Sequence, residues 1–96
     1  MQITREDIVR VGLEVKVILD FTLTNAEANS AVNIAHIGTV EALSVPPPYG
    51  EILALVIQAE AANIQANNHG RGVGANIHYI LFPAPPHFSQ TLFFPL

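Results

Sequence analysis

The chain has 96 residues, a length typical of one small domain, so we expect a single domain over residues 1–96. Half of its residues are hydrophobic and only 12% are charged, whereas an average soluble domain has about 25% charged residues. It contains no cysteine, which excludes disulfides as a source of stability. A domain of this size buries only about 60–65% of its unfolded surface. We therefore expect another subunit to cover part of this surface.

The net charge of −4 comes with only four basic residues, which are scattered along the chain. Binding to phosphates requires clustered Lys and Arg, so we expect no nucleic-acid partner. Polar residues, Pro or Gly interrupt every apolar stretch well before the roughly 20 residues that cross a bilayer, so we expect no membrane partner. The first residues lack the basic head and apolar run of a secretion signal, which predicts synthesis in the cytoplasm.

The charged residues are unevenly distributed. Seven of the twelve lie in the first twenty positions, whereas residues 61–96 contain only Arg71. The deficit of charge therefore belongs to the C-terminal third, and we expect the covered surface there.

Residues 1–12 are predicted to form a short N-terminal helical segment. Thr4 has the pattern of an N-cap, Glu6 and Asp7 would follow in the first turn, and Gly12 would end the helix. From Leu13 to Thr24, apolar residues alternate with mostly polar ones. This period of two predicts a long strand with one apolar face, in an antiparallel sheet.

The middle of the chain is predicted as short elements joined by a stiff connection. Residues 25–30 are interpreted as a loop, and the β-branched residues of 31–45 predict two short strands. Pro46-Pro47-Pro48-Tyr49-Gly50 lacks three backbone N–H groups in succession, which excludes a central strand. Its first four residues also match the short ligand of WW domains, but a rigid connection is the favoured interpretation.

Residues 51–68 have two interpretations. Their Ala, Leu, Gln and Glu content favours a helix. As one continuous helix, however, the segment would have polar residues all round and no apolar stripe. As a strand with one bulge near Ala61, it would have a regular apolar face. We therefore predict a strand, with a helix as the alternative.

The C-terminal third is predicted as a hairpin followed by an arm. Residues 67–74 read as a glycine-rich turn and residues 76–82 as a strand. Prolines end that strand and complete a β core over residues 13–83. Residues 84–96 form an apolar arm, which we expect to dock on its own domain or on a neighbour, because an exposed apolar segment without charge promotes aggregation.

No catalytic or metal-binding constellation is recognised. The four histidines have no spacing that sets two imidazoles side by side, and no cysteine is available, so we expect no metal site and no cofactor. The serines lie in no nucleophile context, and the carboxylates are interpreted as a solvated face, so we do not expect an enzyme. The residues considered were His36, His69, His78, His87, Ser30, Ser44, Ser89, Glu41, Glu51 and Glu60.

Two sets of residues are candidates for contacts with a partner. Amides on polar faces either face water or lie in an interface, because they form hydrogen bonds without the desolvation cost of a charge; they are Asn33, Gln58, Asn63, Gln65, Asn67 and Asn76. The predicted interface itself consists of one isolated cation and six large side chains: Arg71, Tyr79, Phe88, Leu92, Phe93, Phe94 and Leu96.

The resulting fold prediction is a mostly β domain, an antiparallel sandwich or jelly roll of about six to eight strands, with the N-terminal helix and the C-terminal arm. The alternative is an α+β domain in which residues 51–68 are helical. The predicted function is a structural subunit of a homo-oligomer, a trimer or larger, which also contacts another structural protein. By analogy of fold and composition, a bacteriophage virion component is the best candidate, such as a capsid decoration, cement, neck or tail protein.

The alternative function is a small binding module for a carbohydrate or a receptor. It would use Tyr49, Tyr79, His78 and the amides. The two functions differ in an observable property, because only the structural subunit has to self-associate.

Overall fold

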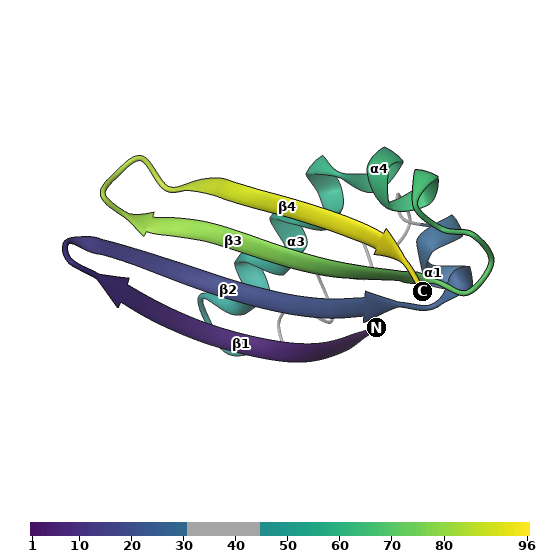
Figure 1. The fold of residues 1–96 in the computed structure, drawn as a ribbon, viewed down its shortest axis with the longest axis horizontal. Coiled ribbons are helices and arrows are strands. Elements are labelled where there is room, and N and C mark those ends of the chain that lie inside the picture. The colour runs from purple at the N-terminus through teal and green to yellow at the C-terminus, as the bar shows by residue number, and fades with distance from the viewer. Residues whose placement is uncertain (31–44) are drawn as a thin grey trace.

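A computed structural model describes residues 1–30 and 45–96. The elements in chain order are β1 (Gln2–Val11), β2 (Glu14–Leu23), α1 (Asn25–Asn29), α3 (Tyr49–Ala59), α4 (Ala61–Ala66), β3 (Val73–Phe82) and β4 (His87–Pro95). The four strands form one antiparallel sheet in the order β1-β2-β3-β4. Figure 1 shows the helices on one face of this sheet. The opposite face is called the open face below.

The first twenty-three residues form a hairpin, so the predicted N-terminal helix is wrong. Residues 2–11 pair with β2 along their length, with one bulge between Ile3 and Arg5. Gly12 has a φ of 60° and is the first of two residues between the strands, the position that favours glycine in a tight hairpin turn. The turn that was interpreted as a helix stop therefore joins two strands. The long strand predicted after Gly12 is confirmed as β2.

The last residues form a second hairpin. The strand predicted over residues 76–82 is confirmed within β3, and the predicted arm contributes a fourth strand, β4, rather than a separate segment. The glycine-rich segment is not a hairpin turn, because it joins α4 to β3. Gly72 in this segment has a φ of 97°, and a side chain there would collide with the carbonyl of Leu23, so only glycine fits.

Three helices of the described residues lie in the middle of the chain. The predicted loop over residues 25–30 is instead largely α1, which begins at Thr24 with a complete capping box. The strand predicted for residues 51–68 is wrong and the helical alternative is correct, although Glu60 divides the segment into α3 and α4. The two short strands predicted for residues 31–45 lie outside the described residues except for Val45.

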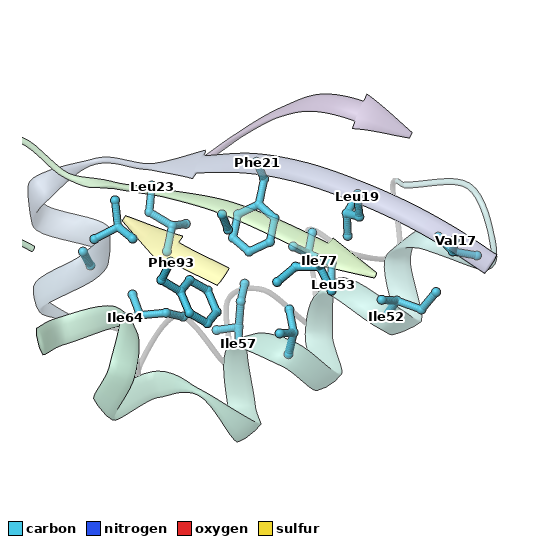
Figure 2. Packing of buried hydrophobic residues seen from close by; sticks show 14 residues of the cluster. Val17, Leu19, Phe21, Leu23, Ile52, Leu53, Ile57, Ile64, Ile77 and Phe93 are labelled. Carbon is cyan, nitrogen blue, oxygen red and sulfur yellow. The ribbon is translucent and has the colours of Figure 1, made fainter. Parts of the chain in front are cut away.

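The core fills the space between the sheet and the helices (Figure 2). β2 contributes every second residue from Val17 to Leu23, and α3 contributes two adjacent pairs one turn apart. Because this stripe matches the helical period, α3 buries one face on the sheet. The largest fully buried side chains of the core are those of Val17, Leu19, Phe21, Leu23, Leu53, Val56, Ile57, Ile64, Val73 and Ile77.

The chain is thus mostly β, with a four-stranded antiparallel sheet and a few short helices. The predicted sandwich or jelly roll is not confirmed, since residues 1–30 and 45–96 contain one sheet. None of the described helices has the length and apolar character needed to span a bilayer.

Candidate interaction surface at the edge of the sheet

The two edges of the sheet differ in charge. β1 and β4 are the edge strands, and edge strands have backbone groups that can pair with another chain. β1 carries four charged residues, Arg5, Glu6, Asp7 and Arg10, whereas residues 87–96 carry none. Because the strands lie in the sheet in chain order, the uneven charge of the sequence becomes a charged edge at β1 and a neutral edge at β4. Lysines and other charges block unwanted pairing at an edge, and β4 has no such protection.

The register of β4 determines which of its backbone groups point outward. The backbone N–H of Leu96 donates a hydrogen bond of 3.1 Å to the carbonyl of Gly72. Hydrogen-bonded and non-hydrogen-bonded pairs alternate along an antiparallel ladder, so Phe94, Leu92 and Gln90 direct their backbone groups toward β3. The backbone N–H and C=O groups of Thr91 and Phe93 therefore point away from the sheet. The backbone nitrogen of Pro95 also points away from the sheet, and an edge strand tolerates proline at such a position because no hydrogen bond to the neighbouring strand is lost.

The side chains of β4 divide between the two faces of the sheet. Phe93 points toward the helices and is only 6% exposed, so it belongs to the core. Leu92 and Phe94 lie opposite Asn76 and Gly74 on the open face. They are 52% and 43% exposed, and Leu96 is 47% exposed. The predicted interface residues of the C-terminus are thus one core residue and three exposed apolar residues beside the free edge.

Phe94 occupies a space that a glycine leaves open. Its ring lies directly over Gly74, and any side chain at position 74 would overlap with that ring. An aromatic ring over a glycine on the neighbouring strand compensates for the missing side chain. Phe94 is therefore held flat against the open face, with nearly half of its surface still exposed.

The remaining predicted interface residues do not join this surface. The rings of Tyr79 and Phe88 meet edge to face with centroids 4.8 Å apart, and both pack against the core from the helix side. Arg71 is exposed on the loop before β3, beside Met1 and Leu96 at the rim of an open pocket of about 360 Å³. It makes no ion pair with any residue of the described ranges.

A row of polar side chains crosses the open face. Asp20 accepts a hydrogen bond of 2.5 Å from the Asn76 amide, and Gln90 donates to the Asn76 oxygen. On β1, Arg5 donates to Asp7 at 2.5 Å. This hydrogen bond raises the pKa of Arg5 and outweighs the lowering by desolvation, and the charges of Asp7 and Asp20 add to the rise. These hydrogen bonds join side chains of neighbouring strands and of β1 itself, so the row helps to hold the open face of the sheet in place.

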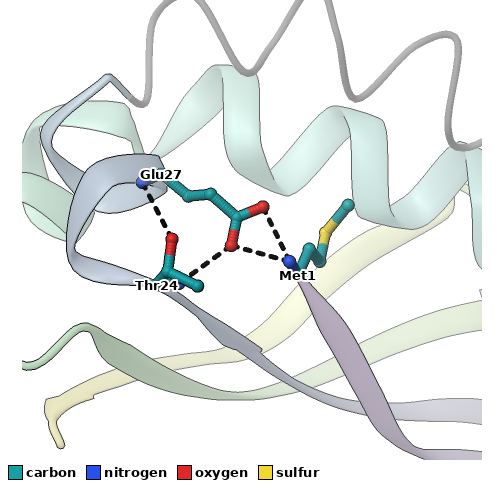
Figure 3. Close-up of polar contacts among 3 residues, drawn as sticks. All are labelled: Met1, Thr24 and Glu27. Atoms are coloured by element: carbon teal, nitrogen blue, oxygen red, sulfur yellow. Dashed lines mark hydrogen bonds and ion pairs between the residues drawn. The ribbon is translucent and has the colours of Figure 1, made fainter.

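A second polar cluster joins the start of β1 to α1 (Figure 3). The Met1 ammonium donates to both carboxylate oxygens of Glu27, at 2.6 and 2.7 Å, and the Thr24 backbone N–H donates at 2.9 Å. Partial burial would raise the pKa of Glu27, but the hydrogen bonds from Met1 and Thr24 outweigh it, so the pKa is lowered. Glu27 therefore stabilises the fold in its ionised form.

The amides considered as interface residues mostly bond within the chain. Gln65 donates to the Asn29 carbonyl at 3.1 Å, and Asn67 donates to the Asn63 carbonyl at 2.8 Å. Sequence reasoning missed Asn68, whose side-chain oxygen accepts from the backbone N–H groups of Gly70 and Gly72. The only signal for it was its position before two glycines, where Asn is a common turn residue. Gln58 is exposed and Asn33 lies outside the described residues.

The structure does not bring together the residues of the predicted binding module. Tyr49 and Tyr79 pack against the core, whereas His78, the neighbour of Tyr79 on the strand, faces the opposite side of the sheet. His69 and His87 are exposed and His36 lies outside the described residues. Within residues 1–30 and 45–96, no three His, Asp or Glu side chains gather in a group that could hold a metal ion.

The chain was also compared with known proteins. No protein-family model, curated protein or solved structure matches it. The candidate surface therefore has to be interpreted from its own residues.

Proposed function

We propose that this protein is a subunit of a homo-oligomeric assembly and that β4 forms its main contact. The observation that carries the proposal is the β4 edge, which pairs with no other strand of residues 1–30 and 45–96, has no charged residue and is flanked by the exposed side chains of Leu92, Phe94 and Leu96. A long, neutral and apolar edge aggregates unless a partner covers it. Such an edge is a liability for a protein that works as a monomer.

The helix beside β4 supports the proposal. α4 contributes Ile64 to the same core cluster as Phe93 of β4, and Figure 2 shows these two side chains together. Residues 61–66 contain no charge. The neutral surface therefore includes both the strand edge and the helix that packs beside it. Charged residues are depleted at the centre of protein interfaces, and this surface has that composition.

A bacteriophage virion component, such as a capsid decoration, cement, neck or tail protein, remains the more specific prediction for this subunit. It follows from the composition and the β-rich fold rather than from any particular contact. Its test is a search for the chain in purified particles by mass spectrometry.

The test of the general proposal is the mass of the protein in solution. Sedimentation velocity from about 1 to 100 μM, the range of ordinary specific association, should show an oligomer that dissociates on dilution. A monomer at every concentration would contradict the proposal and favour the alternative function, a small binding module. Deletion of residues 91–96 is a poor probe, because it would also remove Phe93 from the core.

A further inference from the structure

We infer that the partner of β4 is β4 of a second copy. The two strands pair antiparallel about a two-fold axis that passes between the two copies of Leu92. This inference rests on the proposed function and specifies its contact. Pairing of this kind would join two four-stranded sheets into one of eight strands, with the helices of both copies on the same face. Two-fold contacts are the commonest in homo-oligomers.

The absence of charge on β4 favours a second copy over a different protein. A two-fold axis sets the residue that lies on it directly against the same residue of the partner, so a charge at that position would meet a like charge. Residues 87–96 have no Asp, Glu, Lys or Arg, so no position of the axis along β4 sets two like charges against each other. Recognition of a different protein commonly uses opposite charges, and the edge offers none.

The outward backbone groups select the register. Thr91 and Phe93 direct their N–H and C=O groups outward, and Leu92 lies between them. With the axis at Leu92, Thr91 of each copy lies opposite Phe93 of the other, and each pair exchanges two hydrogen bonds. All outward N–H and C=O groups of these two residues are then satisfied. Pro95, which has no N–H, falls outside these pairs.

The same register places exposed apolar side chains in contact. Leu92 meets its own copy on the open face, in a non-hydrogen-bonded pair whose side chains approach most closely. Phe94 lies opposite Gln90 of the second copy and diagonal to its Leu92. The two side chains of β4 that are about half exposed in one copy are thereby covered by the other. A dimer results, and a trimer or larger assembly would need a second contact.

The absence of cysteine makes the register directly testable by single cysteine substitutions. A disulfide needs Cα atoms about 4.4–6.8 Å apart, and the two copies of residue 92 would lie about 4.5–5.5 Å apart. Under mild oxidation we expect Leu92→Cys to form a covalent dimer at least about tenfold faster than Leu13→Cys, because pairing raises the effective concentration of the thiols. Leu13 is the matched control, a leucine 85% exposed at the β1–β2 turn.

Two further variants identify the axis. Gln90→Cys and Phe94→Cys should cross-link slowly when each is alone and rapidly when they are mixed, since each faces the other across the axis. Equal rates for Leu92→Cys and Leu13→Cys, or no gain on mixing, would overturn the inferred contact. If the wild-type protein is nevertheless an oligomer, the proposed function stands and the β4 pairing falls. If the wild-type protein is a monomer, both fall.

Discussion

A charge placed on the two-fold axis should dissociate the dimer without affecting the fold. Leu92 is 52% exposed, so Leu92→Lys changes a side chain that the core does not need. In the dimer, however, the two lysines would lie directly opposite each other. The variant therefore separates the stability of the subunit from the stability of the contact.

The expected effect follows from the surface that each copy still exposes. Full burial of a leucine contributes about 1.5–3 kcal/mol, and about half of that remains to be gained at Leu92, or about 2 kcal/mol for two copies. Like charges opposite each other add up to about 1 kcal/mol. A loss of about 2–3 kcal/mol weakens the dimer about 30- to 140-fold in Kd.

Sedimentation equilibrium of the wild-type protein, Leu92→Lys and Leu13→Lys measures this effect. The control introduces the same charge at an exposed leucine far from β4, so its dimer Kd should stay within about twofold of the wild type, as surface substitutions usually do. A mixture of Leu92→Lys and Leu92→Glu should associate again, because opposite charges then face each other. If Leu92→Lys associates as tightly as the wild type, or if Leu13→Lys weakens the dimer equally, the reasoning is refuted.

Three further predictions test the backbone and the electrostatics. Thr91→Pro should weaken the dimer while leaving the fold intact, because the N–H of Thr91 points away from β3. Leu92→Pro should instead unfold the chain, because it removes a backbone hydrogen bond to β3. Equal melting temperatures of the two variants would contradict the direction assigned to these backbone N–H groups. Gly72→Ala should lower the free energy of unfolding, measured in urea, by more than about 1–3 kcal/mol, because a positive φ and contact with the Leu23 carbonyl both oppose a side chain. An unchanged free energy of unfolding would contradict this prediction. Glu27→Gln keeps the helix cap but loses the charge. It should lower the free energy of unfolding at pH 7, and the difference should shrink as the pH falls below the ordinary value of 4.5 and through the lowered folded-state pKa. A difference that is unchanged at pH 3 would argue against the ion pair with Met1.

A strand was predictable from the sequence where its place in the sheet leaves an alternation of apolar and polar residues. The alternation after Gly12 is strong because β2 is a central strand with one side against the helices, so a period of two remains in the sequence. β1 was missed for the opposite reason. It is an exposed edge strand that buries few side chains, and the Thr-Arg-Glu-Asp sequence imitates a helix start. Its pairing with β2 overrides that local preference, as tertiary contacts often do.

Residues 51–68 show how a break conceals a helix. α3 buries two pairs one turn apart, Ile52 with Leu53 and Val56 with Ile57, which is a regular stripe. The helix ends at Ala59, and Glu60, which has a non-helical backbone conformation, separates it from α4. When the whole segment is treated as one helix, Glu60, Asn63 and Asn67 fall on the same side as the apolar stripe of α3, so no continuous apolar face remains. The break could not be predicted, because neither Gly nor Pro marks it.

The interaction surface was predictable in part. The charge-free C-terminal third drew attention to Leu92, Phe94 and Leu96, and these are exposed beside the free edge. Tyr79 and Phe88 were indistinguishable from them by residue type. Only the sheet register shows that these two face the core. The direction of the backbone at Thr91 and Phe93 depends on hydrogen bonding, and no sequence pattern reports it.

Amide hydrogen exchange at Thr91 and Phe93 tests the central claim most directly, because these N–H groups point away from β3, pair with no other strand among the described residues and are expected to be paired when a second copy binds. Exchange should be slow at high protein concentration and become faster on dilution, while the amides of Leu92 and Phe94, which bond to β3, stay protected throughout. Fast exchange of Thr91 and Phe93 at every concentration would contradict the account.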